Sequence, residues 1–73
     1  MRGQVASMED LGAIIRRIRE SHGMSQRQLA AELGTSQRYV YELETGKPKR
    51  ADGSFFQILT RLGITLTVET ADE

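Results

Sequence analysis

The densest group of charged side chains in the 73-residue chain lies between Arg16 and Arg50, and its chemistry is that of anion binding. Eight basic residues fall in this stretch against four acidic ones, although the formal net charge of the whole chain is zero. The last five residues, 69–73, carry three acids and no base. A locally basic middle and an acidic end favour a protein with one surface for a polyanion such as DNA and a separate end that does not bind it.

Catalytic and metal-binding chemistry has little support in the sequence. The chain has no cysteine and a single histidine, His22, which has no partner residues for a metal site or a catalytic dyad. Neither a nucleophile–base pair nor a phosphate-cradling glycine loop is present. We therefore expect a protein that is not an enzyme and that takes no cofactor, metal or small-molecule substrate.

Hydropathy predicts the compartment. No apolar run approaches the roughly 20 residues of a membrane span, and the first residues lack the apolar core of a signal peptide. We expect a cytoplasmic, nucleoid-associated protein with no membrane partner. A chain of this length buries only about 60% of the surface that its unfolded form exposes, so a second copy is expected to supplement its small core.

Four segments carry the start and stop signals of helices. A serine precedes each of the first three: Ser7 with Asp10 three residues later, Ser25 with Gln28, and Ser36. Apolar residues at helical spacing follow, and a glycine ends each segment. The sequence predicts helices over 8–22, from Ser25 to Gly34, from Ser36 to Gly46, and from Asp52 or Ser54 to Gly63.

The second and third predicted helices form a tight helical hairpin. Ala30 is small enough for one helix to cross closely over the other, and Gly34 supplies the positive φ that the turn requires. Val40 and Leu43 are the inward residues of the third helix. The free face of that helix carries Gln37, Arg38, Tyr41 and Glu42.

After Gly63 the apolar period changes from helical to alternating. Ile64, Leu66 and Val68 alternate with polar residues, which is typical of a half-buried strand over 64–69. A single strand cannot satisfy its own backbone hydrogen bonds, and no other segment reads as a strand. We expect it to pair with the same strand of a second copy across a two-fold axis.

The stretch 26–50 resembles the DNA-binding domains of the lambdoid-repressor, or Xre-type, helix-turn-helix family, and the resemblance extends over about residues 9–62. The C-terminal part, Phe55-Phe56-Gln57-Ile58-Leu59 followed by Ile64-Thr65-Leu66-Thr67-Val68, is similar to antitoxins of the HipBA type, in which the terminal strand pairs between protomers. The resemblance implies a mostly α, four- to five-helix repressor-like domain with a short C-terminal strand shared by a homodimer. The chain then divides into a flexible arm (1–7), a helix-turn-helix domain (8–63), a dimerisation strand (64–69) and an acidic tail (70–73).

The resemblance also implies roles for individual residues. Base contacts are expected from the start and free face of the third helix: Ser36, Gln37, Arg38 and Tyr41. Gln37 has the amide that bonds N6 and N7 of adenine, and Arg38 the fork that bonds O6 and N7 of guanine. Phosphate contacts are expected from Gln26, Arg27, Lys47, Lys49 and Arg50, and a structural ion pair from Arg19 and Glu44. The dimer interface is expected to contain Phe56, Ile64, Leu66 and Val68.

Three residue-level questions stay open at this stage. Tyr41 either packs or reaches DNA. Glu42 repels phosphate unless it accepts from a cytosine amino group. Phe55 and Phe56 are adjacent and cannot both face one core, so one of them is expected at the dimer contact.

The function predicted from these features is that of a transcriptional repressor that binds double-stranded operator DNA as a homodimer. The HipBA resemblance narrows it to an antitoxin that binds a HipA-like kinase toxin and represses their shared operon. Two alternatives remain: a stand-alone phage or restriction-modification controller, and a protein-interaction module on the same fold that does not read DNA.

Overall fold

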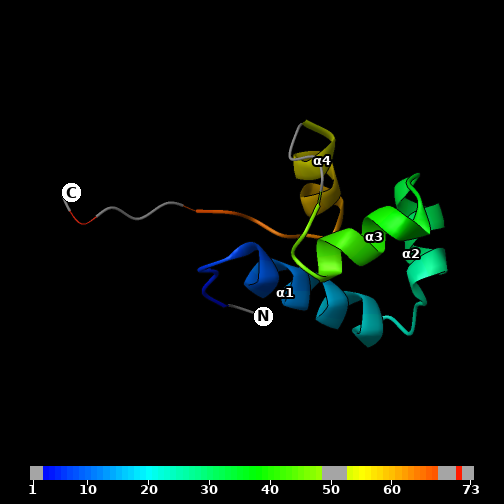
Figure 1. Cartoon of the computed structure of the whole chain (residues 1–73), viewed down its shortest axis with the longest axis horizontal. Helices are drawn as coiled ribbons and strands as arrows, with labels where there is room; N and C mark the ends of the chain where they lie inside the picture. The colour runs from blue at the N-terminus through cyan, green and yellow to red at the C-terminus, as the bar shows by residue number, and fades with distance from the viewer. Residues whose placement is uncertain (1–2, 49–52, 68–70, 72–73) are drawn as a thin grey trace.

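The computed structural model describes residues 3–48, 53–67 and 71, and its body consists of helices joined by short turns (Figure 1). Within these residues the helices are α1 (Met8–Ser21), α2 (Gln26–Leu33), α3 (Gln37–Glu44) and α4 (Gly53–Arg61). All four lie where the sequence predicts them, and α1 ends one residue early because His22 is its C-cap. The mostly helical fold class is thereby confirmed, with four helices in the described part.

Each of the first three helices begins at a serine whose side-chain oxygen accepts a hydrogen bond from a backbone N–H three residues later. The pairs are Ser7 with Asp10, Ser25 with Gln28 and Ser36 with Tyr39, each at 3.1 Å. At α2 the Gln28 side chain also accepts from the Ser25 N–H, at 2.7 Å, which completes a capping box. These bonds satisfy N–H groups that have no partner within the helix, so local sequence fixes where the helices begin.

All four helices end in the same motif, seen most simply at Gly34. Its φ of 68° lies in the left-handed region, where a side chain would be strained. The Gly34 N–H donates to the Ala31 carbonyl at 3.3 Å, and the Thr35 N–H donates to the Ala30 carbonyl at 2.9 Å. This pair of bonds is the Schellman motif, and it recurs at Gly23, Gly46 and Gly63.

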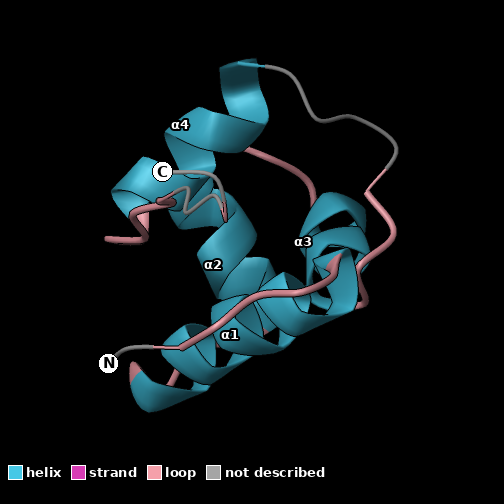
Figure 2. Cartoon of the chain, turned by 90° about the vertical axis from the view of Figure 1, so that its left-hand side faces the viewer, coloured by secondary structure: helices cyan, strands magenta, loops and turns pink. Residues whose placement is uncertain are grey.

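The core contains two apolar clusters, and both include residues of α3. Figure 1 shows α3 between α1 and α4, and in the turned view of Figure 2 α2 lies in the middle with α3 to one side. The larger cluster joins α1, α3 and α4 through Leu11, Ile15, Tyr39, Leu43, Phe55, Ile58 and Leu59. A smaller cluster joins α2 to α3 through Leu29, Ala30 and Val40. Val40 is fully buried against Ala30, which agrees with the close crossing predicted for the two helices.

Two glycines let the backbones of α1 and α3 touch. A Cβ atom at Gly12 of α1 would lie 2.4 Å from the carbonyl oxygen of Leu43 and 2.5 Å from that of Glu44. On the other side, a Cβ atom at Gly46 would lie 2.6 Å from the Cα atom of Glu9. The start of α1 and the end of α3 are therefore in backbone-to-backbone contact, closer than any side chain permits. Gly12 had no predicted role.

The segment after α4 leads away from the helices (Figure 1). Residues 64–67 are in no strand in the single chain that is described, so neither the predicted strand nor its pairing across a dimer is confirmed. Ile64 packs partly against the core, and Leu66 is 48% exposed. Val68 and Glu69 lie outside the described residues, as do Met1 and Arg2 of the predicted arm and most of the predicted acidic tail. No helix in the described ranges is long and apolar enough to cross a membrane.

We predict that Gly12→Ala destabilises the protein even though alanine favours helix by about 1 kcal/mol over glycine. The added methyl group must push α1 away from the end of α3, and overpacking of this kind costs about 1–3 kcal/mol. Urea unfolding followed by circular dichroism measures the change. Gly53→Ala is the matched control, because among the described residues no atom beyond its chain neighbours lies within 4 Å of a Cβ there, and it should leave the stability unchanged or slightly higher. A Gly12→Ala protein as stable as the wild type would contradict the close contact.

Candidate nucleic-acid interface

α3 has one buried face and one exposed face. Ser36 caps its first turn, and Tyr39, Val40, Leu43 and Glu44 are buried. Val40 and Leu43 are inward as predicted. Gln37, Arg38 and Tyr41 are exposed. The exposed fraction of Tyr41 is 57%, so this side chain does not pack into the core and is available to a partner.

The four residues expected to contact bases lie together at the start and outer face of α3. Ser36, Gln37 and Arg38 are consecutive at its first turn, and Tyr41 follows one turn after Gln37. The Ser36 oxygen accepts from the Tyr39 N–H, which leaves the hydroxyl proton of Ser36 free to be donated. The set presents amide, guanidinium and hydroxyl groups, the donors and acceptors that read base edges in a major groove.

Glu42 shares this face, and the structure gives it a partner that the sequence analysis did not foresee. Its Oε2 lies 3.5 Å from Nε of Arg38, one helical turn earlier. The Arg38 side chain is 78% exposed and the Glu42 side chain only 16%. The acid is therefore the less exposed member of the pair, and the neighbouring guanidinium offsets its negative charge on this face.

The end of α3 is fixed to α1 by the predicted ion pair. Nε of Arg19 lies 2.6 Å from Oε2 of Glu44, and Nη2 of Arg19 lies 3.0 Å from Oε1 of Glu44. The side chains are only 12% and 3% exposed, respectively. Hydrogen bonding to Glu44 raises the pKa of Arg19 above its ordinary value, although burial opposes the shift. Arg19 is therefore charged at any pH at which the protein folds.

Two further hydrogen bonds extend this pair to the turn before α2. Nη1 of Arg19 donates to the Met24 carbonyl oxygen at 2.7 Å, and Nε2 of Gln26 donates to Oε1 of Glu44 at 3.1 Å. We call Arg19, Met24, Gln26 and Glu44 the buried ion-pair cluster. No buried side-chain nitrogen or oxygen in the described ranges lacks a hydrogen-bond partner. The cluster ties the end of α1, the start of α2 and the end of α3 together.

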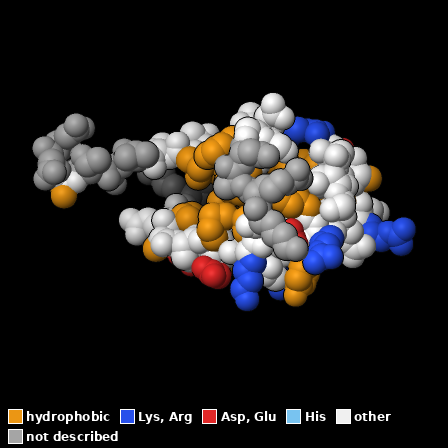
Figure 3. Space-filling view, turned by 45° about the horizontal axis from the view of Figure 1, so that its top comes forward, with side chains coloured by type: hydrophobic (Ala, Val, Ile, Leu, Met, Phe, Trp, Pro, Cys, Tyr) orange, Lys and Arg blue, Asp and Glu red, His pale blue; other side chains and the backbone are white. Residues whose placement is uncertain are grey.

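The structure describes only some of the residues expected to contact phosphate. Lys47, three residues after the end of α3, and Arg27, in the first turn of α2, are exposed, and Gln26 is half-buried in the ion-pair cluster. Lys49 and Arg50 lie outside the described residues. On the face drawn in Figure 3, lysine and arginine side chains lie toward the end of the molecule away from the C-terminal segment, and apolar side chains open to the surface nearer that segment.

Two structural residues of this site were missed by the sequence analysis. Tyr39 is buried in the core, and its spacing of four from Leu43 is a helical core signal that was available. Gly12 follows Leu11 inside an otherwise regular helix, and a glycine there signals a close approach. Among the described residues, no group of three or more histidine, cysteine or acidic side chains is placed to hold a metal ion.

Comparison with known proteins gives consistent matches. The helix-turn-helix family HTH_3 matches residues 15–68. An uncharacterised HTH-type transcriptional regulator of Sinorhizobium fredii, y4mF, is 31% identical over 68 residues, which are 93% of this chain and 90% of that protein. A HipB variant in complex with an O2 20-mer has a TM-score of 0.75 at 24% identity, over 97% of this chain and 99% of that one. A HipA–HipB–O2–O3 complex gives a TM-score of 0.74 at 23% identity, over 96% and 99%.

The helical hairpin of α2 and α3, with its exposed polar face, defines a helix-turn-helix DNA-binding domain. The chain belongs to the Xre-type helix-turn-helix family of transcriptional regulators, as the sequence motif from Gln26 to Arg50 predicted. Members of this family are DNA-binding regulators rather than enzymes. The HipB structures share its fold over nearly the whole chain.

We predict that Glu44→Ala is among the most destabilising substitutions in the chain. It leaves the guanidinium of Arg19 largely buried without its carboxylate, and breaking a buried pair in this way costs about 3–5 kcal/mol. The free energy of unfolding, measured in urea, gives the loss.

The exposed ion pair of α1 is the control, because Arg16 and Glu20 are joined at 3.2 Å but are 63% and 52% exposed. Glu20→Ala should change the stability by no more than about 0.5 kcal/mol. The double variant Arg19→Met with Glu44→Leu should recover much of the loss, because it leaves no unpaired charge. Equal effects of Glu44→Ala and Glu20→Ala would show that the cluster contributes nothing beyond a surface pair.

Proposed function

We propose that the protein is a sequence-specific transcriptional repressor that binds a palindromic operator as a homodimer. The observation that carries this proposal is the exposed polar face of α3 on a helix whose other face is fixed by two apolar clusters and the buried ion-pair cluster. A helix held in this way presents its side chains in one orientation, as reading a base sequence requires. The α3 helices of two protomers would enter successive major grooves about 34 Å apart.

Within this proposal the residues divide into those that read bases and those that bind the backbone. Gln37 reads an adenine and Arg38 a guanine, with Ser36 and Tyr41 beside them. Lys47, Arg27 and Gln26 bind phosphates, together with Lys49 and Arg50 of the loop after α3. Base contacts supply specificity and phosphate contacts supply most of the affinity, which makes binding sensitive to salt.

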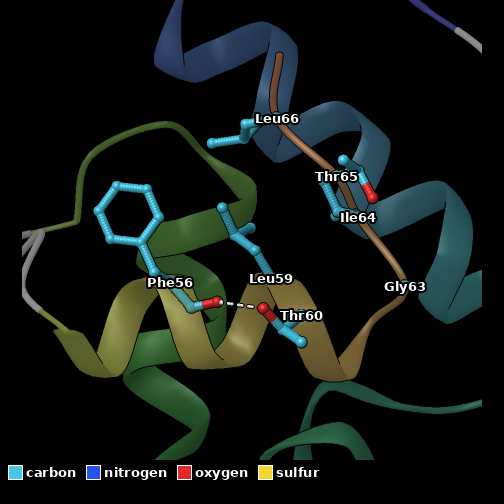
Figure 4. A pocket seen from close by; sticks show the side chains of 7 residues that line it. All are labelled: Phe56, Leu59, Thr60, Gly63, Ile64, Thr65 and Leu66. Atoms are coloured by element: carbon cyan, nitrogen blue, oxygen red, sulfur yellow. Dashed lines mark hydrogen bonds between the residues drawn. The ribbon is translucent and has the colours of Figure 1, made fainter.

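The dimer contact is proposed for a groove between α4 and the segment that follows it. The groove has a volume of about 420 Å³, and its lining includes Phe56, Leu59, Ile64 and Leu66. Figure 4 shows Phe56 and Leu66 at its two sides with Leu59 between them. Phe55 is buried and Phe56 is 54% exposed, so Phe56 is the member of the aromatic pair that is available to a partner. A second copy would cover these apolar surfaces and supply the missing strand partner for residues 64–69.

A narrower role, that of an antitoxin, is proposed from the similarity to HipB. HipB is described in complexes with O2, and with HipA, O2 and O3 together. The match extends over 96–97% of this chain, including the C-terminal segment that ordinary phage repressors lack. We place the protein in a HipBA-like module, where it would bind a HipA-like kinase toxin and repress their operon. A kinase-like reading frame overlapping the end of this gene would favour the antitoxin over a stand-alone controller.

DNA recognition is tested by selecting duplexes from a random pool with the wild-type protein and measuring the affinity of variants for the selected site. Gln37→Ala should cost about 1–3 kcal/mol, all of it at one base step. Lys47→Ala should weaken binding to every sequence and lower the slope of log affinity against log salt by about one.

Gln57→Ala is the matched control for Gln37→Ala, because Gln57 is an exposed glutamine on α4 and should leave the affinity unchanged. If the wild-type protein enriches no sequence from the pool over random duplex, the repressor proposal is wrong.

Dimerisation is tested with Leu66→Ser, which changes an exposed side chain of the groove and removes no core contact. We expect the variant to sediment as a monomer at concentrations where the wild type is a dimer, and to bind the selected site more weakly. Val5→Ser is the control, since Val5 is similarly exposed, at 42%, but lies before α1. A Leu66→Ser protein that remains fully dimeric would rule out the groove as the interface.

A further inference from the structure

The pair formed by Arg38 and Glu42 runs against the electrostatics of its own helix. Arg38 is in the first turn of α3, where the helix dipole favours an acid, and Glu42 is in the last turn, where it favours a base. The order of the pair, base before acid, is also the weaker one for residues four apart on a helix. The pair therefore contributes little to the stability of α3 at these two positions.

Binding to the DNA backbone does not explain Glu42 either. A carboxylate on the face that meets DNA lowers the affinity for every sequence, because it repels phosphate. Glu42 instead forms an ion pair with Arg38. Its Oε2 lies 3.5 Å from Nε of Arg38, and the Glu42 side chain is 16% exposed whereas the Arg38 side chain is 78% exposed.

The position of the carboxylate selects which donors of Arg38 remain. The ion pair joins Glu42 to Nε of Arg38, so the two terminal Nη groups are left to bind another partner. These two groups are the fork that bonds O6 and N7 of guanine. A long exposed side chain loses rotamer entropy when it binds DNA. Because the ion pair already restricts the rotamers of Arg38 in the free protein, less of this entropy is lost on binding.

We propose that Glu42 is a positioning residue that orients Arg38 to read a G·C pair, so that it raises the specificity of the protein while lowering its general affinity for DNA. This inference rests on the proposed contact between Arg38 and guanine. It assigns Glu42 a role through Arg38 in place of a direct contact with cytosine.

The experiment compares Glu42→Gln with the wild type on three duplexes: the selected site, the same site with the Arg38-dependent G·C pair changed to A·T, and a random duplex. That base pair is the one at which Arg38→Ala loses its preference. Glu42→Gln keeps the shape of the side chain and removes its charge. We expect tighter binding to the random duplex, because one repulsive charge is gone, and a loss of about fivefold or more in discrimination between G·C and A·T.

Glu20→Gln is the matched control. It removes the same charge from a pair with the same order and spacing, Arg16 with Glu20, on α1. It should leave discrimination unchanged. In an Arg38→Ala background, Glu42→Gln should also leave discrimination unchanged, because Glu42 acts only through Arg38. Circular dichroism verifies that each variant keeps the wild-type helix content.

The outcomes separate this inference from the function on which it rests. If Glu42→Gln discriminates between G·C and A·T as well as the wild type does, this inference is wrong. It is also wrong if Glu42→Gln loses the same discrimination in the presence and in the absence of Arg38. If Arg38→Ala loses its base preference at no position of the site, the proposed guanine contact and this inference are both wrong, while the repressor function stands. If the wild-type protein prefers no sequence at all, the proposed function itself is wrong.

Discussion

The position of α3 depends first on the bidentate pair between Arg19 and Glu44. An ion pair this sheltered is favourable only when its geometry is good and its remaining oxygens and protons are satisfied. Both carboxylate oxygens of Glu44 accept from Arg19, and Gln26 adds a third donor. The end of α1 and the start of α2 are thereby joined to a single carboxylate at the last residue of α3, 18–25 residues further along the chain. The orientation of the opposite end of α3, where Gln37 and Arg38 lie, follows from that anchor.

The α1–α3 contact provides a second constraint that the ion pair alone does not. Gly12 and Gly46 remove the two side chains that would separate the backbones, so the start of α1 lies directly against the end of α3. The ion pair limits rotation of α3 and the glycine contact limits its distance from α1. Together they allow a helix of only eight residues, too short to be stable alone, to present a defined surface.

The features that could be predicted from the sequence are those fixed by neighbours along the chain. Serine caps and glycine stops are local, so the ends of α1, α2 and α3 were predicted to within about a residue, and the resemblance to known repressors supplied the pair of Arg19 and Glu44. Tyr39 and Gly12 carried a signal in their spacing and residue type, but which element each one meets depends on the packed fold. The contact between Arg38 and Glu42 depends on side-chain rotamers, which the sequence does not fix. The segment 64–69 was predicted as a strand from its alternation, but a strand needs a partner, and a single chain does not provide one.

The repeated glycine endings have a consequence for how the chain folds. Each helix of 8–14 residues is marginal in isolation, yet the ends of all four and the starts of α1, α2 and α3 are specified by bonds that span only a few positions. Helical segments that form transiently in the unfolded chain are therefore expected to favour the native boundaries, and docking of the helices must supply the remaining stability. Proteins dominated by such short-range contacts fold in microseconds to milliseconds. Folding of the single chain is therefore expected to be fast, and the slower step toward a DNA-binding dimer is the concentration-dependent association of two copies.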